Sequence, residues 1–174
     1  MDNVQKLKHT IDTLFGYGVS KNLPKDIEII ISKKTGRIRN VNHNGNLLFT
    51  SRTDGGLAIT RYCAGLFLKN KKFRENCLEI DAESKSFVEE GRSVFCQHVV
   101  SCGKNVRIGS DVPVLYKNKV VGVGKAVLST IMILNQQRGV AIKIRDSLKS
   151  QTDGGNSSWC VEAIAKCEEW WIRW

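Results

Sequence analysis

Six cysteines and three histidines are the side chains of this sequence best suited to nucleophilic or metal chemistry. The cysteines are Cys63, Cys77, Cys96, Cys102, Cys160 and Cys167. No pair has Cys-x-x-Cys spacing, and none lies near a histidine in a zinc-like pattern. The sequence therefore predicts mostly buried free thiols, with no metal and no cofactor. Cys160 and Cys167 are seven residues apart on a possible helix and could share a face, where a structural role is favoured over a metal site.

Recognisable catalytic motifs are missing from the sequence. It contains no GxSxG, no HExxH and no GxxxxGK[ST] phosphate loop. The stretch GVGKAV, at 122–127, loosely resembles a phosphate loop but lies inside a predicted strand, so we interpret it as a bend. His98 is expected in the middle of a strand without an acidic partner, which favours a packing role. With no activated nucleophile and no paired carboxylates, an enzyme acting on nucleotides is the least favoured hypothesis.

The net charge of the chain favours a binding function over a catalytic one. The net charge is +10, from 27 Lys and Arg against 17 Asp and Glu. Residues 1–77 hold 14 basic and 6 acidic side chains, residues 78–149 hold 11 and 7, and residues 150–174 hold 2 and 4. Such a balance favours a polyanion such as nucleic acid, because bound phosphates release counterions. The alternative is a basic protein without a polyanion partner.

The sequence also predicts the location of the protein. No apolar stretch approaches the ~18 residues of a transmembrane helix, and the N-terminus lacks the pattern of a secretory signal. We therefore expect a cytoplasmic protein.

The first half should be mixed helix and sheet. Val4, Leu7, Ile11 and Leu14 make one apolar stripe of a helix over 1–15. Strands are expected at 27–31, 38–41, 47–51 and 57–60, with a hairpin turn at Asn44-Gly45. Thr60 should cap a helix to about residue 70, and residues 69–74 should form a basic exposed segment.

In the second half, the predicted elements follow the order of strand, helix, glycine, strand. A strand at 78–80 leads to a helix capped by Asp81 and ended by Gly91. Further strands are expected at 93–100, 112–117, 120–128 and 140–145, with a loop at 103–110 and a short helix after Ser129. In the last strand, Val140, Ile142 and Ile144 should face the core and Ala141, Lys143 and Arg145 should face outward.

The last residues differ in composition. Residues 152–158 read as a flexible linker, and all four tryptophans follow it: Trp159, Trp170, Trp171 and Trp174. Several exposed tryptophans would form a costly apolar patch, so we expect this segment to dock on the body or on a partner.

Four motifs carry a resemblance to a known family: FVEEGRSVF at 87–95, RIGSDVPVL at 107–115, VGVGKAVLS at 121–129 and RGVAIKIR at 138–145. They resemble the PUA domain, in particular that of archaeosine tRNA-guanine transglycosylases, an archaeal-type family. The segment at 35–60 and the helix after it are similar to the small α+β domain that precedes PUA in that enzyme. The resemblance spans roughly residues 27–149.

The resemblance implies an α+β fold in three parts. Residues 1–76 would be a small α+β domain, residues 77–149 a PUA-like β pseudobarrel with flanking helices, and residues 150–174 a linker and Trp-rich tail. It also implies structured RNA as the partner, in particular the acceptor stem of tRNA. The family's catalytic barrel, with its nucleophilic aspartate and zinc site, does not fit in a chain this short.

The resemblance also implies which residues contact RNA. Gly91, Arg92 and Ser93 form the glycine loop, where the backbone could approach RNA and Arg92 could pair with phosphate. Arg138, Lys143 and Arg145 flank the last strand, and Lys104 and Arg107 lie in a loop within reach of the RNA backbone. For the lysines and arginines, a solvated face is the alternative. Phe87 and Phe95 are expected in the core.

Two functions follow. The first is a non-catalytic tRNA-binding protein, acting alone or as the accessory subunit of a separate tRNA-modifying enzyme. The second is a protein-interaction factor in ribosome assembly or translation, held to its partner by the N-terminal stripe and the Trp-rich tail.

Overall fold

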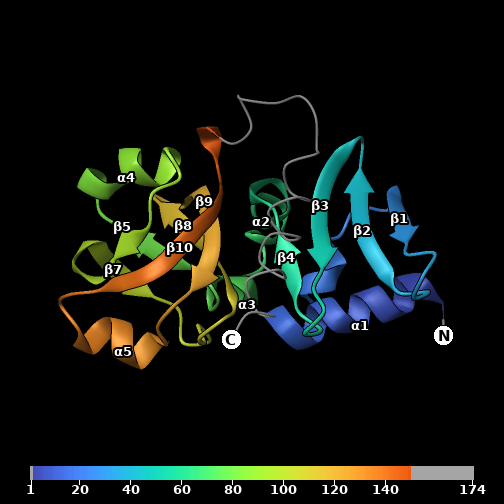
Figure 1. The fold of residues 1–174 in the computed structure, drawn as a ribbon, viewed down its shortest axis with the longest axis horizontal. Coiled ribbons are helices and arrows are strands. Elements are labelled where there is room, and N and C mark those ends of the chain that lie inside the picture. The colour runs from blue at the N-terminus through green and yellow to red at the C-terminus, as the bar shows by residue number, and fades with distance from the viewer. Residues whose placement is uncertain (1, 150–174) are drawn as a thin grey trace, which may run out of the picture.

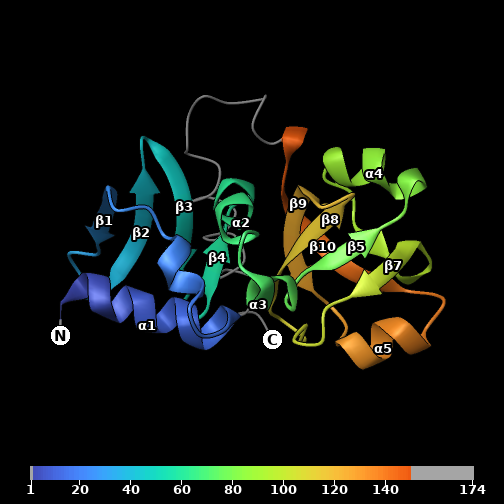
Figure 2. The ribbon, with the colours of Figure 1, turned by 180° about the vertical axis from the view of Figure 1, so that it is seen from behind.

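The computed structural model describes residues 2–149, so the predictions for Cys160, Cys167 and the Trp-rich tail lie outside the described residues. Two β-sheets stand side by side, with two short helices between them (Figures 1 and 2). The class is α+β, as the sequence predicts. No described helix is long and apolar enough to cross a membrane.

The first sheet is an antiparallel meander in the order β1-β2-β3-β4. Its strands are β1 (Ile27–Ile31), β2 (Ile38–His43), β3 (Asn46–Ser51) and β4 (Leu57–Ile59). The β2–β3 turn has positive φ at both central residues, 50° at Asn44 and 76° at Gly45. A two-residue turn of this kind matches the twist of the strands, and it confirms the predicted hairpin.

Helix α1 (Asn3–Phe15) lies along this sheet and is followed by the 3-10 turn η1 (Val19–Asn22). The predicted helix is confirmed, but its buried face is rotated. Leu7, Ile11 and Phe15 are buried, whereas Leu14 is 40% exposed. The i, i+4, i+8 row of these three residues packs better than the predicted stripe, because the bulky Phe15 ring completes it.

Helices α2 (Arg61–Phe67) and α3 (Lys71–Arg74) lie between the sheets in both views. The Thr60 hydroxyl accepts a hydrogen bond from the Cys63 N–H at 3.3 Å, so the predicted cap is confirmed. The prediction of an exposed segment at 69–74 is wrong at Phe73, which is fully buried. The Phe73 ring meets those of Phe15 and Phe67, each at a centroid distance of 5.5 Å. A single aromatic anchor thus pulls a basic segment onto the core.

The second sheet has the order β6-β10-β9-β8-β5-β7. Its elements are β5 (Leu78–Ile80), α4 (Ala82–Glu89), β6 (Val94–Phe95), η2 (Cys96–His98), β7 (Val99–Cys102), β8 (Asp111–Tyr116), β9 (Lys119–Ala126), α5 (Thr130–Asn135) and β10 (Val140–Ser147). The single strand predicted at 93–100 is wrong. Strands β6 and β7 lie at opposite edges of the sheet, and η2 turns the chain from one edge to the other. The sheet is therefore a nearly closed barrel with flanking helices, as expected.

Two glycines let the barrel curl. A Cβ on Gly124 would lie 2.3 Å from the carbonyl oxygen of Lys143, and one on Gly122 would lie 3.1 Å from Val88. Only glycine allows β9 to approach β10 and α4 this closely. The interpretation of GVGKAV as a bend, and not as a phosphate loop, agrees with this packing.

The hydrophobic clusters of the two halves meet. The first cluster contains Phe67 and Phe73, and it also takes in Leu115 of β8 and Val123 of β9. The second cluster fills the barrel around Leu78, Val114 and Ile142. Because residues of the second sheet complete the first cluster, the two halves are packed against each other through α2 and α3.

Candidate nucleic-acid interface

The glycine loop after α4 is a helix-ending motif with a fixed geometry. Gly91 has φ 88°, its N–H donates to Val88 O at 2.9 Å, and the Arg92 N–H donates to Phe87 O at 2.9 Å. This pair of bonds is the Schellman motif, which requires a left-handed residue at the glycine position. The turn fixes the direction in which the chain leaves the helix, and so it fixes where Arg92 stands.

Arg92 is held at the surface by two neighbours. Its guanidinium carbon lies 5.2 Å from the centre of the Phe87 ring, and its Nε lies 3.2 Å from Glu90 Oε2. The Arg92 side chain is 67% exposed. Phe87 and Phe95 are 44% and 48% exposed, so the expectation that they belong to the core is wrong. Exposed rings beside an arginine are surfaces on which nucleic-acid bases can stack.

Strand β10 gathers most of the predicted RNA-binding residues along one edge. Val94 pairs with Ile142 and Phe95 with Val140, which makes Ser93 and Lys143 neighbours. A Cβ at Gly91 would lie 3.4 Å from Ser147 Oγ, so the glycine turn adjoins the far end of the strand. Arg138 is exposed just before β10 begins. Five predicted residues therefore share this edge: Gly91, Arg92, Ser93, Arg138 and Lys143.

A second lysine on the barrel surface was missed by sequence reasoning. Lys143 of β10 pairs directly with Lys125 of β9, and both are exposed. Like charges directly opposite each other destabilise a sheet. An anion bound between the two lysines would therefore offset their electrostatic repulsion. Lys125 lies between buried Gly124 and Ala126, and this alternation along the strand is the sequence pattern from which its exposure could have been predicted.

The two loop residues lie apart from each other. Arg107 is exposed, and its loop adjoins β9 through the Gly109 N–H, which donates to Ala126 O at 2.8 Å. Arg107 therefore borders the face that carries Lys125. Lys104 instead forms an ion pair with Glu75 at 3.0 Å, on the β5 side of the sheet. Its contact with RNA stays a prediction.

Arg145 has a structural role beside the RNA contact predicted for it. Its guanidinium donates to both carboxylate oxygens of Asp111, at 3.0 and 2.9 Å, and to Ile59 O at 2.6 Å. Asp111 is buried and also accepts the Ile59 N–H at 2.9 Å. Arg145 thus joins β10 to β4 of the other sheet. The bidentate pair is a structural role that the sequence did not predict, and the contact of Arg145 with RNA stays a prediction.

His98 also differs from expectation, because it has an acidic partner. Its Nδ1 lies 2.9 Å from Asp81 Oδ2. Together with Glu83, these side chains place three metal-type ligand atoms within 4.8 Å of one another. The other oxygen of Asp81 accepts hydrogen bonds from the Ser84 N–H and hydroxyl, at 2.9 and 2.8 Å. Helix capping and the pair with His98 account for this arrangement.

The described cysteines are free, and three of the four are buried. Burial raises the pKa of the Cys63 thiol far above its usual value and that of Cys77 to about 12. A thiol in this state is a poor nucleophile and a poor metal ligand. The prediction of buried free thiols is confirmed for the described residues.

Comparison with known families identifies the fold. Residues 77–148 match the PUA domain, and residues 5–72 match the patch-forming domain C2 of tRNA-guanine transglycosylase. Residues 77–148 therefore form a PUA domain, which belongs to a class of domains that binds RNA.

The order of the two domains is that of the C-terminal region of tRNA-guanine(15) transglycosylases, which the chain resembles. The enzyme of Methanobrevibacter smithii is 32% identical over 151 residues, which cover 85% of this chain and 23% of the relative. That of Thermoplasma volcanium is 32% identical over 146 residues, covering 83% and 23%. The chain thus spans about a quarter of the length of these curated relatives.

Solved structures agree on the fold. A hypothetical protein from Pyrococcus horikoshii has a TM-score of 0.66 at 16% identity, covering 91% of this chain and 94% of its own. A conserved PUA-domain protein from Thermoplasma acidophilum has a TM-score of 0.60 at 17% identity, covering 90% and 93%. Both halves are therefore arranged as in known proteins.

Proposed function

We propose that this chain is a non-catalytic RNA-binding protein whose RNA is tRNA, held at the acceptor stem. The observation that carries the proposal is the edge formed by the Schellman turn and β10. There, Arg92, Lys143 and Lys125 are exposed, and Gly91 in the turn has no side chain. Two or three cations at fixed spacing suit consecutive phosphates, whereas base-specific readout needs further contacts.

A binding role without catalysis is supported by the state of the reactive groups. The thiols of Cys63 and Cys77 are buried with raised pKa values, and the carboxylates of Asp81 and Asp111 are engaged in structural hydrogen bonds. We therefore expect the chain alone to exchange no labelled guanine into tRNA. Incorporation above the background without protein would contradict the non-catalytic role.

Titration of tRNA at increasing salt tests the binding. We expect the affinity to fall linearly with salt on logarithmic axes, because each phosphate contact releases a counterion. Arg92→Ala and Lys143→Ala should each weaken binding by roughly tenfold and reduce the salt slope by about one. Lys33→Ala, at an exposed lysine in the β1–β2 loop, is the matched control and should leave affinity unchanged.

Specific results would contradict the proposal that the chain binds tRNA. Absence of binding at low salt, or binding that does not respond to salt, would sink it. Unchanged affinity in both variants would show that the RNA lies elsewhere on the molecule.

A protein partner is supported by a separate observation. Ile131 and Leu134 of α5 are 72% and 61% exposed, and Ile108 in the neighbouring loop is 64% exposed. Exposed apolar residues of this size favour an interface with another protein. We propose that the partner is the subunit of a separate tRNA-modifying enzyme. Co-purification of partners with the wild-type chain and with the Ile131→Ser variant tests this proposal. Recovery of ribosomal particles would instead favour the alternative role in ribosome assembly or translation.

A further inference from the structure

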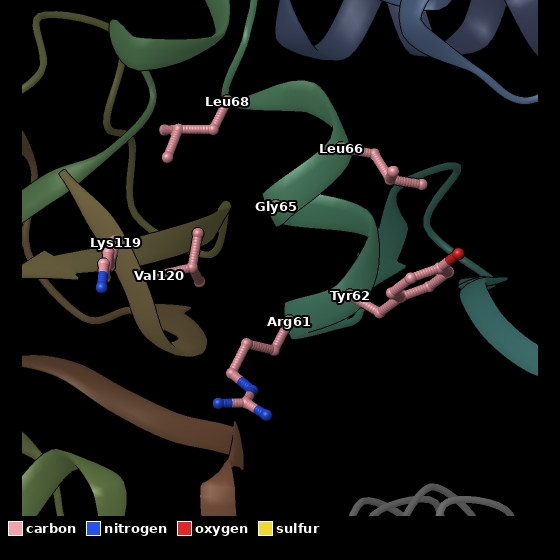
Figure 3. A pocket seen from close by; sticks show the side chains of 7 residues that line it. All are labelled: Arg61, Tyr62, Gly65, Leu66, Leu68, Lys119 and Val120. Carbon is pink, nitrogen blue, oxygen red and sulfur yellow. The ribbon is translucent and has the colours of Figure 1, made fainter.

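A groove of about 430 Å³ lies at the surface between α2 and β9 (Figure 3). Gly65 lies at its centre, and Leu66, Leu68 and Val120 supply apolar walls. Arg61 and Lys119 stand at its rim. We call this the junction groove. Its volume falls within the ~300–1,000 Å³ of typical small-molecule sites.

Gly65 leaves the surface of α2 open where it lines the groove. It lies inside α2, where glycine is among the least favourable residues. A Cβ at this position would meet nothing within 4 Å, so packing does not require glycine. The residue therefore weakens the helix and leaves its surface hollow, which is the pattern expected where a ligand approaches the backbone.

Further cations lie in or near the chain turn that precedes Lys119. Lys117 lies in the turn before Lys119, and its amine is 5.4 Å from the centre of the Tyr116 ring. The amine of Lys85, from α4, is 5.6 Å from the same ring centre. Arg74 donates to the Asn118 side chain at 2.6 Å in the same turn. Among the described residues that line the groove there is no acid. The surroundings therefore favour an anionic ligand with an apolar part.

The junction groove adjoins the proposed RNA edge through the end of β10. The Arg61 N–H donates to Asp146 Oδ2 at 2.6 Å, which ties the rim of the groove to that strand. The next residue, Ser147, lies beside Gly91. One RNA could therefore contact the Schellman turn and enter the groove, since only the end of β10 separates them.

We propose that the junction groove holds one unstacked nucleotide of the bound RNA, with its base against Leu68 and Val120 and its phosphate at Lys119. The proposal rests on the proposed function. A nucleotide joins an apolar face to an anion, which is the pairing that the groove offers. An extended peptide would need a free strand edge, and β9 is already paired on both sides.

Two hairpin RNAs test the proposal: one blunt-ended, and one identical except for a four-nucleotide single-stranded extension. The wild-type chain should bind the extended RNA about tenfold more tightly, the scale of one base contact. Gly65→Leu, which adds a side chain at a position where a Cβ meets no atom within 4 Å, should remove that gain and leave blunt RNA binding unchanged. Lys119→Gln should reduce the gain. The controls are Gln5→Leu, at an exposed position of α1, and Lys33→Gln, at an exposed position of the β1–β2 loop.

The outcomes separate the two proposals. If the extension gives no gain, or Gly65→Leu keeps the whole gain while folded by circular dichroism, the nucleotide site is overturned and a protein occupant becomes the better explanation. If the wild-type chain binds neither RNA, the proposed function fails, and the nucleotide site fails with it.

Discussion

The two halves of the molecule use charge differently. Residues 1–77 hold 14 of the 27 basic side chains against 6 acids, yet many of those cations stand on loops and short helices. The barrel half has a smaller excess, but Arg92, Lys125 and Lys143 are set by a Schellman turn and by strand pairing. The comparison teaches that charge density identifies the class of partner, whereas backbone geometry selects the cations that can match a fixed phosphate spacing.

The two halves also differ in how much the hydrophobic core of each depends on residues of the other. The first cluster includes Leu115 and Val123 from the barrel, whereas the barrel's own cluster contains no described residue of β1–β4. Asp111 and Arg145 then bind Ile59 of β4. The first half therefore depends on the barrel for its packing.

Removing the carboxylate that joins the halves should give the largest effect. Asp111→Ala leaves the Arg145 guanidinium and the Ile59 N–H without their acceptor in a buried site. We expect a loss of about 2–3 kcal/mol in the free energy of unfolding, because the buried Ile59 N–H and the Arg145 guanidinium lose hydrogen bonds to a charged acceptor. Urea denaturation measures it. Asp26→Ala, at an exposed acid before β1, should change stability by less than ~0.5 kcal/mol and is the control.

A loss below about 1 kcal/mol in Asp111→Ala would contradict the dependence described above. Two separate unfolding transitions in the variant would sharpen the comparison, since they would show that the halves unfold independently once the contact is gone.

Two glycines, one in each half, should respond to alanine with opposite signs. Gly91→Ala forces a side chain into a residue with φ 88° and should cost about 1–2 kcal/mol. Gly65→Ala adds a methyl group to a helix interior with open space and should stabilise by about 0.5–1 kcal/mol. Thermal unfolding of the two variants checks the prediction. Destabilisation by Gly65→Ala would mean that α2 needs glycine for packing, and the reason given for the groove would then be wrong.

Acid should produce the smallest effect, through one carboxylate in each half. Burial opposes ionisation of Asp81, but hydrogen bonds from His98 and Ser84 outweigh it and lower its pKa. In Asp54, the Gly56 N–H lowers the pKa most, with help from Arg52. Because both pKa values are depressed, the stabilisation is complete above the unfolded pKa of about 3.9 and is lost as pH falls through the folded values.

Asp81→Asn and Asp54→Asn isolate these contributions, since asparagine keeps the capping geometry without the charge. Between pH 6 and pH 3, the wild type should lose up to ~1 kcal/mol more stability than each variant. Denaturant unfolding at the two pH values measures the difference. An equal loss in wild type and variants would remove these carboxylates from the account of acid sensitivity.

Local patterns in the sequence predicted much of the fold. The Asn44-Gly45 turn, the Thr60 and Asp81 caps and the Gly91 stop each depend on residues within a few positions of one another, so they can be recognised without the tertiary structure. The same holds for the glycine loop of the candidate site, whose Schellman geometry follows from the glycine after the helix.

Contacts between distant segments decided the rest. Phe73 is buried because Phe15 and Phe67 receive it, Arg145 is engaged because Asp111 lies across the sheet, and Lys125 gains its significance from Lys143 in the next strand. The predicted strand at 93–100 failed because its two parts belong to opposite edges of one barrel. By itself, then, the sequence determined the turns, caps, charge balance and domain class, since these depend on residue type and short spacing. Only the tertiary structure decided which cations stand exposed on the barrel and which join the two halves, because that choice depends on partners dozens of residues away.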